Sequence, residues 1–182
     1  MGLAIGTVEL NSIASGVNAG DAMLKAAKVK LVMAQPVCPG KYVLIVAGDT
    51  SSVETAVDAG RKTGKDKVVD TNLISSIASE VIPAIMRTTA PEQKEAVGII
   101  ETFSLASAIL AADHAVKSAA VELMEVRLGR GLGGKSFVVM TGNVSDVSTA
   151  ADTVKRQLGG DGMILNIEVI PSLHRDIYEA LL

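Results

Sequence analysis

The chain has 182 residues, of which 48% are apolar and 20% charged, and its formal net charge is −3. This composition excludes an intrinsically disordered protein and supplies a core for one medium domain or two small ones. The slight negative charge and the scarcity of aromatic residues (two Tyr, two Phe, no Trp) argue against nucleic-acid binding. The sequence has neither a signal-peptide pattern nor an apolar run long enough to span a membrane, so we expect a soluble, cytosolic protein.

Hydrophobic periodicity predicts seven elements in the first half of the chain. In chain order they are a strand over 4–10, a helix over 13–27, a strand over 29–34, a strand over 42–47, a helix from Ser51 to about Lys62, a strand over 68–73 and a short final helix. Ser51 is the predicted N-cap of the second helix. The order β-α-β-β-α-β-α predicts an antiparallel sheet with helices packed on it, which is an α+β fold.

The first predicted helix has an apolar stripe with the spacing of an amphipathic helix. The stripe consists of Ile13, Val17, Gly20, Leu24 and Ala27, and the second half repeats it with Leu105, Ile109, Ala112, Val116 and Ala119. Small residues dominate the rest of the first helix. They favour either close packing of the helix on its sheet or close packing between subunits, and the sequence leaves both interpretations open.

The chain is an internal duplication. Residues 4–35 and 96–127 are identical at twelve of thirty-two positions, and residues 41–58 and 135–152 at seven of eighteen. This period is too long for a solenoid and fits two copies of one small domain. Pro91 and its polar neighbours break the pattern, so we predict domains over 1–91 and 92–182.

A phosphate-binding motif in the second copy is predicted to be coincidental. Residues 129–136 (GRGLGGKS) match the pattern G-x-x-x-x-G-K-S. In P-loop proteins the Lys-Ser pair opens a helix, whereas Ser136 leads into 137–140 (FVVM), which predicts a strand. The first copy has CPGK over 38–41 in this place. We interpret the stretch as a glycine-rich strand connection, and a P-loop enzyme is a minor alternative.

Cys38 is the only cysteine and lies between Pro36 and Pro39, which stiffen its loop. One interpretation is an ordinary free thiol. The functional alternative needs several chains, because an iron–sulfur cluster takes several thiolates. A threefold axis would bring three Cys38 thiolates together and leave one iron of a [4Fe–4S] cube without a protein thiolate. The second copy has no Cys in its loop, so three chains would present three Cys and not six.

Other residues give little sign of catalysis. His114 and His174 have no Cys or second His nearby in the sequence, so we do not expect them to bind a metal. Glu9 and Glu101 occupy matching positions inside predicted strands and favour structural roles. No spacing indicates a nucleophile with its base or a pair of catalytic carboxylates. We predict a protein without catalytic residues, not an enzyme.

Two charged pairs recur at matching helical positions, Asp21 with Lys25 and Asp113 with Lys117. An i,i+4 pair of this kind is commonly an exposed contact worth about 0.3–0.5 kcal/mol. The alternative is an edge that meets neighbouring molecules, where the long aliphatic stem of lysine lies against the partner.

Four stretches carry a resemblance to a known family: 4–10 (AIGTVEL), 20–27 (GDAMLKAA), 96–102 (AVGIIET) and 169–171 (VIP). With them the chain resembles tandem-domain shell proteins of bacterial microcompartments over nearly its whole length. The resemblance implies two BMC domains, each an antiparallel sheet with packed helices in a variant of the ferredoxin-like fold. It also implies a location in the shell of the microcompartment, a polyhedral organelle of the cytoplasm.

Within this family, residues 37–41 (VCPGK) resemble the PduT type of propanediol-utilising compartments. That type implies a homotrimer forming a pseudohexameric tile, with one [4Fe–4S] cluster at the central pore bound by Cys38 of each chain. It further implies electron transfer across the shell and a flavin- or iron–sulfur-containing reductase inside the compartment as partner. The implied pore loops contain Pro36, Val37, Pro39, Gly40, Gly131, Leu132 and Gly133. The implied tile edge, which meets other shell proteins, carries Lys25 and Lys117.

The resemblance leaves a second function open. In that alternative the tile is purely structural, its pore passes small metabolites, and Cys38 only lines the pore without a cluster.

Overall fold

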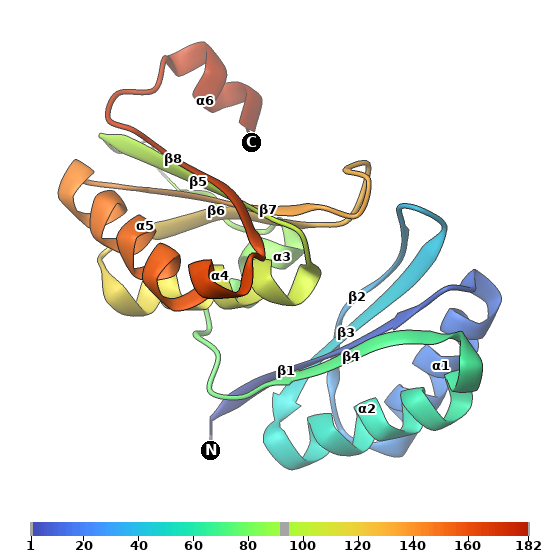
Figure 1. Cartoon of the computed structure of the whole chain (residues 1–182). Helices are drawn as coiled ribbons and strands as arrows, with labels where there is room; N and C mark the ends of the chain where they lie inside the picture. Colours follow the sequence, from blue (N-terminus) through green and yellow to red (C-terminus); the bar gives the residue numbers. More distant parts are fainter. Residues whose placement is uncertain (1, 92–94, 182) are drawn as a thin grey trace. The chain divides into compact units, whose positions relative to one another are not determined.

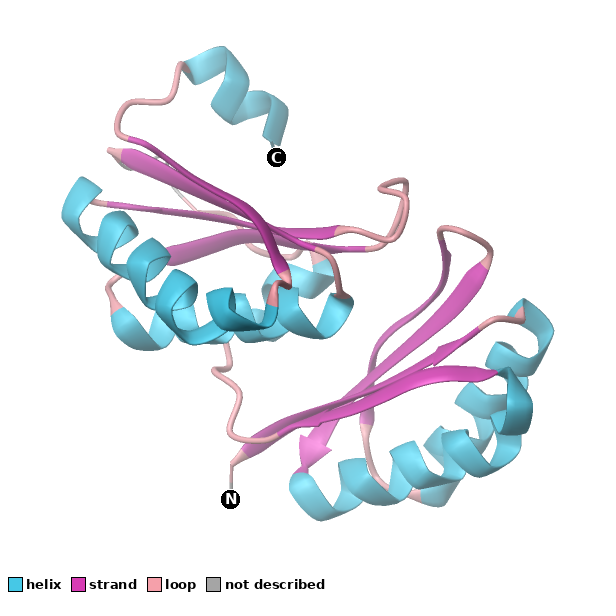
Figure 2. Cartoon of the chain, in the orientation of Figure 1, coloured by secondary structure: helices cyan, strands magenta, loops and turns pink. Residues whose placement is uncertain are grey.

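The computed structural model describes residues 2–91 and 95–181. The chain divides into two compact units, Met1–Ser79 and Glu80–Leu182. Each unit is a four-stranded antiparallel sheet with helices packed on it (Figures 1 and 2), as the α+β prediction requires. No helix among the described residues is both long and apolar enough to cross a membrane.

The first unit contains the first six predicted elements in the predicted order. Its elements are β1 (Leu3–Leu10), α1 (Ile13–Ala26), β2 (Lys30–Val37), β3 (Lys41–Asp49), α2 (Thr50–Gly64), a short 3-10 helix η1 (Lys65–Lys67) and β4 (Val68–Ile74). The strand order is β2-β3-β1-β4, so β2 and β4 are the edges of the sheet. Both helices cover the same face of this sheet (Figure 1). The core between helices and sheet contains Ala4, Val8, Leu10, Ala19, Met23, Leu44, Val46, Val53, Ala56 and Val57.

The predicted stripe of α1 is correct only in part. Gly20 is buried and Ala27 packs against the core, whereas Ile13, Val17 and Leu24 are exposed. The buried face of the helix consists of Gly16, Ala19, Gly20 and Met23. The small residues of this face allow the helix to approach β3 closely. A Cβ atom added at Gly16 would lie 2.5 Å from Cδ1 of Tyr42, and one added at Gly20 would lie 2.8 Å from Cδ2 of Leu44. Gly16 and Gly20 therefore serve helix–sheet packing.

Asp49, and not the predicted Ser51, is the N-cap of α2. The Asp49 carboxylate accepts a hydrogen bond from the backbone N–H of Ser52 at 2.9 Å, and the Ser51 and Ser52 hydroxyls donate to it at 2.7 Å each. These hydrogen bonds lower the pKa of Asp49 to about 2, and the bond from the Ser52 N–H has the largest effect. Ser51 belongs to the first turn of the helix, where its hydroxyl orients the capping carboxylate.

The second unit repeats the same topology. Its elements are α3 (Val81–Met86), β5 (Ala96–Thr102), α4 (Leu105–Ser118), β6 (Glu122–Leu128), β7 (Ser136–Gly142), α5 (Val144–Leu158), a 3-10 helix η2 (Gly159–Asp161), β8 (Ile164–Ile170) and α6 (Arg175–Leu181). The strand order β6-β7-β5-β8 matches that of the first unit. In the repeated stripe of α4, Ile109 and Ala112 are buried, while Leu105, Val116 and Ala119 are half-buried.

Helix α6 covers the face of the second sheet opposite to α4 and α5 (Figure 1). Tyr178 of α6 is buried against Val97, Met124 and Val139 of the sheet. Its hydroxyl donates a hydrogen bond to the carbonyl of Pro91 at 3.0 Å. Burial, and to a lesser degree the charge of Glu122, raise the pKa of this phenol. The C-terminal helix is thus held both by apolar contact and by a bond to the segment before β5.

The short helix that ends the first sequence copy packs with the second unit. Helix α3 contacts β6 and α4, and Val81 and Ala84 are completely buried. The compact units accordingly divide between Ser79 and Glu80, earlier than the break at Pro91 that the composition indicates.

Candidate functional site

Cys38 lies on the turn of the β2–β3 hairpin. The hairpin closes at the pair Val37–Lys41, so Cys38, Pro39 and Gly40 form the turn. Gly40 has φ +79°, a left-handed conformation that favours glycine. Cys38 is half-buried, and its two neighbours in the turn are exposed. The thiol therefore lies at the end of a hairpin that projects beyond the helices of its own unit (Figure 1).

Pro36 and Val37, expected in the loop, are instead the last two residues of β2. A proline cannot donate a ladder hydrogen bond, and an edge strand such as β2 tolerates this loss. Val37 is buried, whereas Pro36 is exposed. The turn that carries Cys38 is therefore shorter than the proline spacing suggests.

An ion pair lies at the base of the Cys38 hairpin. The ammonium Nζ of Lys41 is 2.6 Å from Oε1 of Glu9, and the two side chains are 32% and 17% exposed. Glu9 pairs with Val43 in the ladder, so Lys41 is its diagonal neighbour on the same face. The sequence predicts a structural role for Glu9 but not its partner Lys41, because the contact depends on the register of β1 against β3.

The corresponding hairpin of the second unit has a longer, glycine-rich turn. It closes at Leu128–Ser136 and contains the predicted loop residues Gly131, Leu132 and Gly133. The two glycines are exposed with φ +73° and +61°, and Leu132 is half-buried. Ser136 begins strand β7 as predicted, so the Lys-Ser pair does not open a helix and the P-loop context is absent.

The two expected edge lysines lie near the C-terminal ends of α1 and α4. Lys25 contacts Asp21 and Lys117 contacts Asp113, each with Nζ 2.6 Å from a carboxylate oxygen. The pair on α1 is exposed, while Asp113 is only 7% exposed. The second copy therefore keeps the ion pair, but its carboxylate is buried where that of the first copy is exposed.

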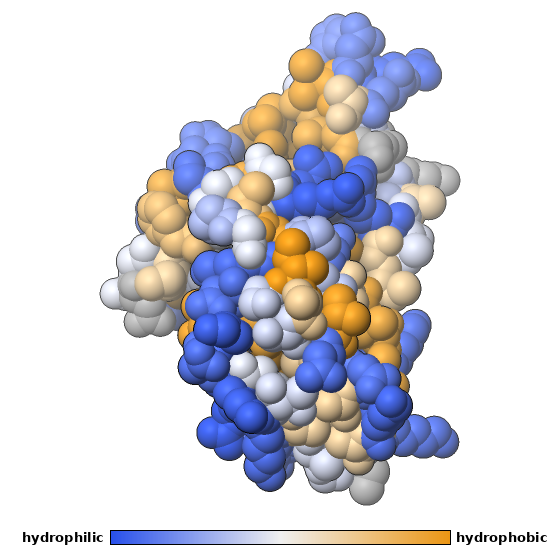
Figure 3. Space-filling view, turned by 90° about the vertical axis from the view of Figure 1, so that its right-hand side faces the viewer, coloured by the Kyte–Doolittle hydropathy of each residue, from blue (hydrophilic) through white to orange (hydrophobic). Residues whose placement is uncertain are grey.

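Apolar side chains remain on the surface, where they mix with charged ones on the face shown in Figure 3. On α1, Ile13, Val17 and Leu24 are all exposed, with Val17 at 56%. They are spaced along one face of the helix. Ile109, the counterpart of Val17 in α4, is 0% exposed. This face is thus exposed on α1, whereas on α4 its residue Ile109 is buried and the flanking Leu105 and Val116 are half-buried.

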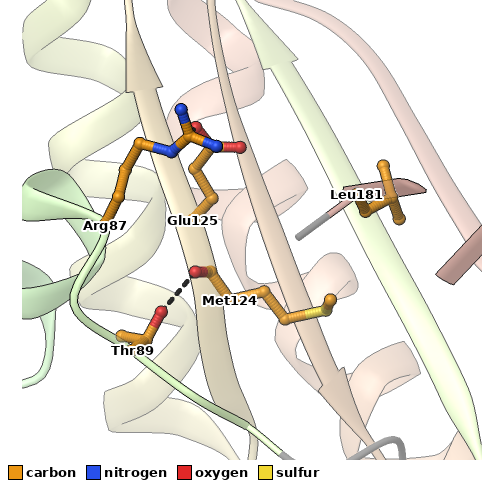
Figure 4. A pocket seen from close by; sticks show the side chains of 5 residues that line it. All are labelled: Arg87, Thr89, Met124, Glu125 and Leu181. Carbon is orange, nitrogen blue, oxygen red and sulfur yellow. Dashed lines mark hydrogen bonds and ion pairs between the residues drawn. The ribbon is translucent and has the colours of Figure 1, made fainter. Parts of the chain in front are cut away.

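A polar cluster in the second unit has no signal in the sequence. Glu125 of β6 is almost completely buried, and it accepts bidentate hydrogen bonds from Arg127 at 2.8 Å each. Nε of Arg87, just after α3, lies 3.2 Å from the same carboxylate. Figure 4 shows Arg87 and Glu125 beside Thr89, whose hydroxyl donates to the carbonyl of Met124. The cluster borders a pocket of about 230 Å³ and ties the end of α3 to β6.

The histidines are separate from these groups. His114 is half-buried on α4, and His174 is exposed with Nδ1 3.7 Å from Asp176. Within residues 2–91 and 95–181, no three His, Cys, Asp or Glu side chains come together as a metal site. A single chain therefore offers Cys38 as one ligand and not as a complete set.

Comparisons with known proteins agree with this architecture. The BMC domain model matches twice, at residues 4–77 and 96–173. The chain is 40% identical over 181 residues to the bacterial microcompartment shell protein PduT of Citrobacter freundii, an alignment that covers 100% of this chain and 98% of the relative. It is also 37% identical over 83 residues to the major carboxysome shell protein of Halothiobacillus neapolitanus, covering 44% of this chain and 85% of that one.

A solved structure gives the same result for the fold. The crystal structure of a microcompartment protein from Desulfitobacterium hafniense superposes with a TM-score of 0.96 at 44% identity, covering 98% of this chain and 99% of that chain. The two matches to the BMC model together span most of the sequence and coincide with the two sheets. The chain belongs to the BMC-domain family of bacterial microcompartment shell proteins, with two such domains in tandem.

Proposed function

We propose that this shell protein forms a trimeric tile in which three chains place six BMC domains in a ring. Family membership makes the chain a component of the microcompartment shell. The internal duplication supports the ring, because two similar units in each chain allow three chains to approximate sixfold symmetry. Lateral contacts with other shell proteins at Lys25 and Lys117 are part of the proposal.

The open face of α1 supports association between chains. Ile13, Val17 and Leu24 expose apolar surface next to the Asp21–Lys25 pair. Clustered exposed apolar side chains commonly mark protein–protein contacts. Because the equivalent position Ile109 is buried in the second copy, a second chain covering α1 would give both copies a similar environment.

We further propose that Cys38 thiolates from three chains hold one [4Fe–4S] cluster at the axis of the ring. The observation that carries this proposal is the position of the only cysteine, half-buried on an exposed hairpin turn of a chain 40% identical to PduT. Three thiolates leave one iron for a non-protein or partner ligand. When bound, the cluster supplies one-electron transfer across the shell, with a flavin- or iron–sulfur-containing reductase in the compartment as electron partner.

Iron and sulfide analysis of protein purified without oxygen tests this proposal. We expect about one cluster per three chains, together with a low-temperature EPR signal after reduction. Cys38→Ser should lose iron, sulfide and signal and keep the trimer. Colourless wild-type protein without a signal would contradict the cluster and leave a structural tile with a metabolite pore. Loss of the trimer in Cys38→Ser would instead assign Cys38 a structural role.

A further inference from the structure

The Glu9–Lys41 ion pair joins the Cys38 hairpin to the middle of its sheet. Glu9 is on β1, which has neighbours on both sides, whereas β2 is an edge strand. Lys41 is half of the residue pair that closes the hairpin, and its ammonium extends from β3 to Glu9 on the adjacent strand β1 at 2.6 Å. Both side chains lie on the sheet face opposite to α1 and α2, because Tyr42 and Val8, their chain neighbours, face those helices.

This contact is important because the turn itself is weakly held. Within the described part of the chain, residues 38–40 form no side-chain hydrogen bond. Pro39 has no N–H to donate, and a Cβ atom added at Gly40 would meet nothing within 4 Å. Among the hydrogen bonds and ion pairs between side chains of the described residues, this pair is the one nearest to Cys38 in the sequence that links the hairpin to another strand.

The second unit supplies an internal comparison. Glu101 and Lys135 occupy the equivalent sequence positions, but the longer turn places Lys135 before the closing residue Ser136. The described residues Glu101 and Lys135 form no ion pair with one another. The pair is therefore present only in the hairpin that carries the cysteine, although both copies contain its two residue types.

We infer that Glu9 and Lys41 are positioning residues that fix the Cys38 turn for a site shared by three chains. This inference rests on the proposed function of Cys38. A cluster held by one thiolate from each chain requires three turns in the same conformation, so greater freedom of each turn makes release of the cluster faster. The Glu9–Lys41 ion pair at the base of the hairpin supplies that restraint without contacting the thiol.

Iron release to a chelator measures this restraint. Glu9→Gln and Lys41→Gln should each release iron about two- to fivefold faster than the wild type, as loss of a partly exposed ion pair predicts. Lys41→Arg and the reversed pair Glu9→Lys/Lys41→Glu keep opposite charges and should restore slow release. Asp58→Asn, which breaks the exposed Asp58–Arg61 pair on α2, is the matched control and should leave release unchanged. Wild-type release rates in both Gln variants would overturn the inference.

Amide hydrogen exchange of the cluster-free chain separates this inference from the cluster proposal. If the wild type binds no iron, the proposed function fails, but the restraint remains measurable in the amides of residues 37–42. Faster exchange there in Glu9→Gln than in Asp58→Asn would support the positioning role. Equal exchange in the two variants would contradict it, whether or not iron is bound.

Discussion

At the scale of single residues, Asp49 stabilises the start of α2 through three hydrogen bonds to its carboxylate. Its pKa of about 2 lies below the usual value for aspartate, so the carboxylate form is favoured by folding. The stabilisation is complete above about pH 4 and is lost as the pH falls toward about 2. We expect Asp49→Ala to lower the urea midpoint at pH 7. The stability of this variant should also change less than that of the wild type between about pH 4 and about pH 2.

Asn143 provides the control for this prediction. It is the N-cap of α5, and its side chain makes no capping hydrogen bond. Asn143→Ala should therefore change the urea midpoint less than Asp49→Ala does. An equal loss in the two variants would show that the carboxylate of Asp49 is not the source of the stabilisation.

In the first unit Gly16 leaves room for the ring of Tyr42. The second unit has a larger and a smaller residue at the equivalent positions, Ala108 and Ser136. A methyl group at position 16 would overlap the Tyr42 ring, so we expect Gly16→Ala to lower the free energy of unfolding by about 1–3 kcal/mol. The double variant Gly16→Ala/Tyr42→Ser reproduces the second copy and should be more stable than Gly16→Ala alone. Urea unfolding measures both, and a double variant less stable than Gly16→Ala would contradict the argument.

At the scale of elements, α6 depends on Tyr178 for its position on the second sheet. Tyr178→Phe removes only the bond to the Pro91 carbonyl and should cost about 0.5–1.5 kcal/mol of unfolding free energy. Tyr178→Ala also removes the apolar contact with Val97, Met124 and Val139 and should cost about 3 kcal/mol or more. Ile177→Ala, next to it but exposed, is the control and should be nearly neutral. Similar losses in all three would mean that α6 is not packed as described.

The order and type of the elements follow from the sequence because strands and helices of one antiparallel unit have clear periodicities. Predicted strands over 4–10 and 68–73 correspond to β1 and β4 to within about a residue. The buried face of α1 could not be predicted in the same way. Periodicity finds the apolar stripe of a helix, but it does not say whether the sheet or another molecule covers that stripe. Gly16 and Gly20 face the sheet because close approach to β3 excludes larger side chains.

The candidate site was predictable in part for a related physical reason. The position of Cys38 in a turn and the strand after Ser136 can be predicted from local sequence. Prolines and glycines restrict or widen the backbone conformations nearby, and runs of β-branched residues favour a strand. The Glu9–Lys41 contact joins residues 32 positions apart and depends on strand register. The link from Arg87 to Glu125 depends on α3 packing with the second unit, which composition did not indicate.

At the scale of the whole molecule, the open face of α1 should control assembly. Val17→Glu places a charge on this face, so we expect the trimer to dissociate while each chain stays folded, because Val17 contributes little to the core. Light scattering after size exclusion measures the mass, and circular dichroism measures folding. Thr55→Glu adds the same charge to an exposed position of α2 and should remain trimeric. A trimeric Val17→Glu protein would place the contact between chains elsewhere.

In the proposed tile, three chains combine their single cysteines into one cofactor site. Native mass spectrometry under anaerobic conditions can examine this site, because it reports the number of chains and the bound iron and sulfide in the same particle. We predict a trimer carrying one [4Fe–4S] unit for the wild type and an empty trimer for Cys38→Ser. A wild-type trimer without iron and sulfide, or a cluster retained on a single chain, would contradict the claim.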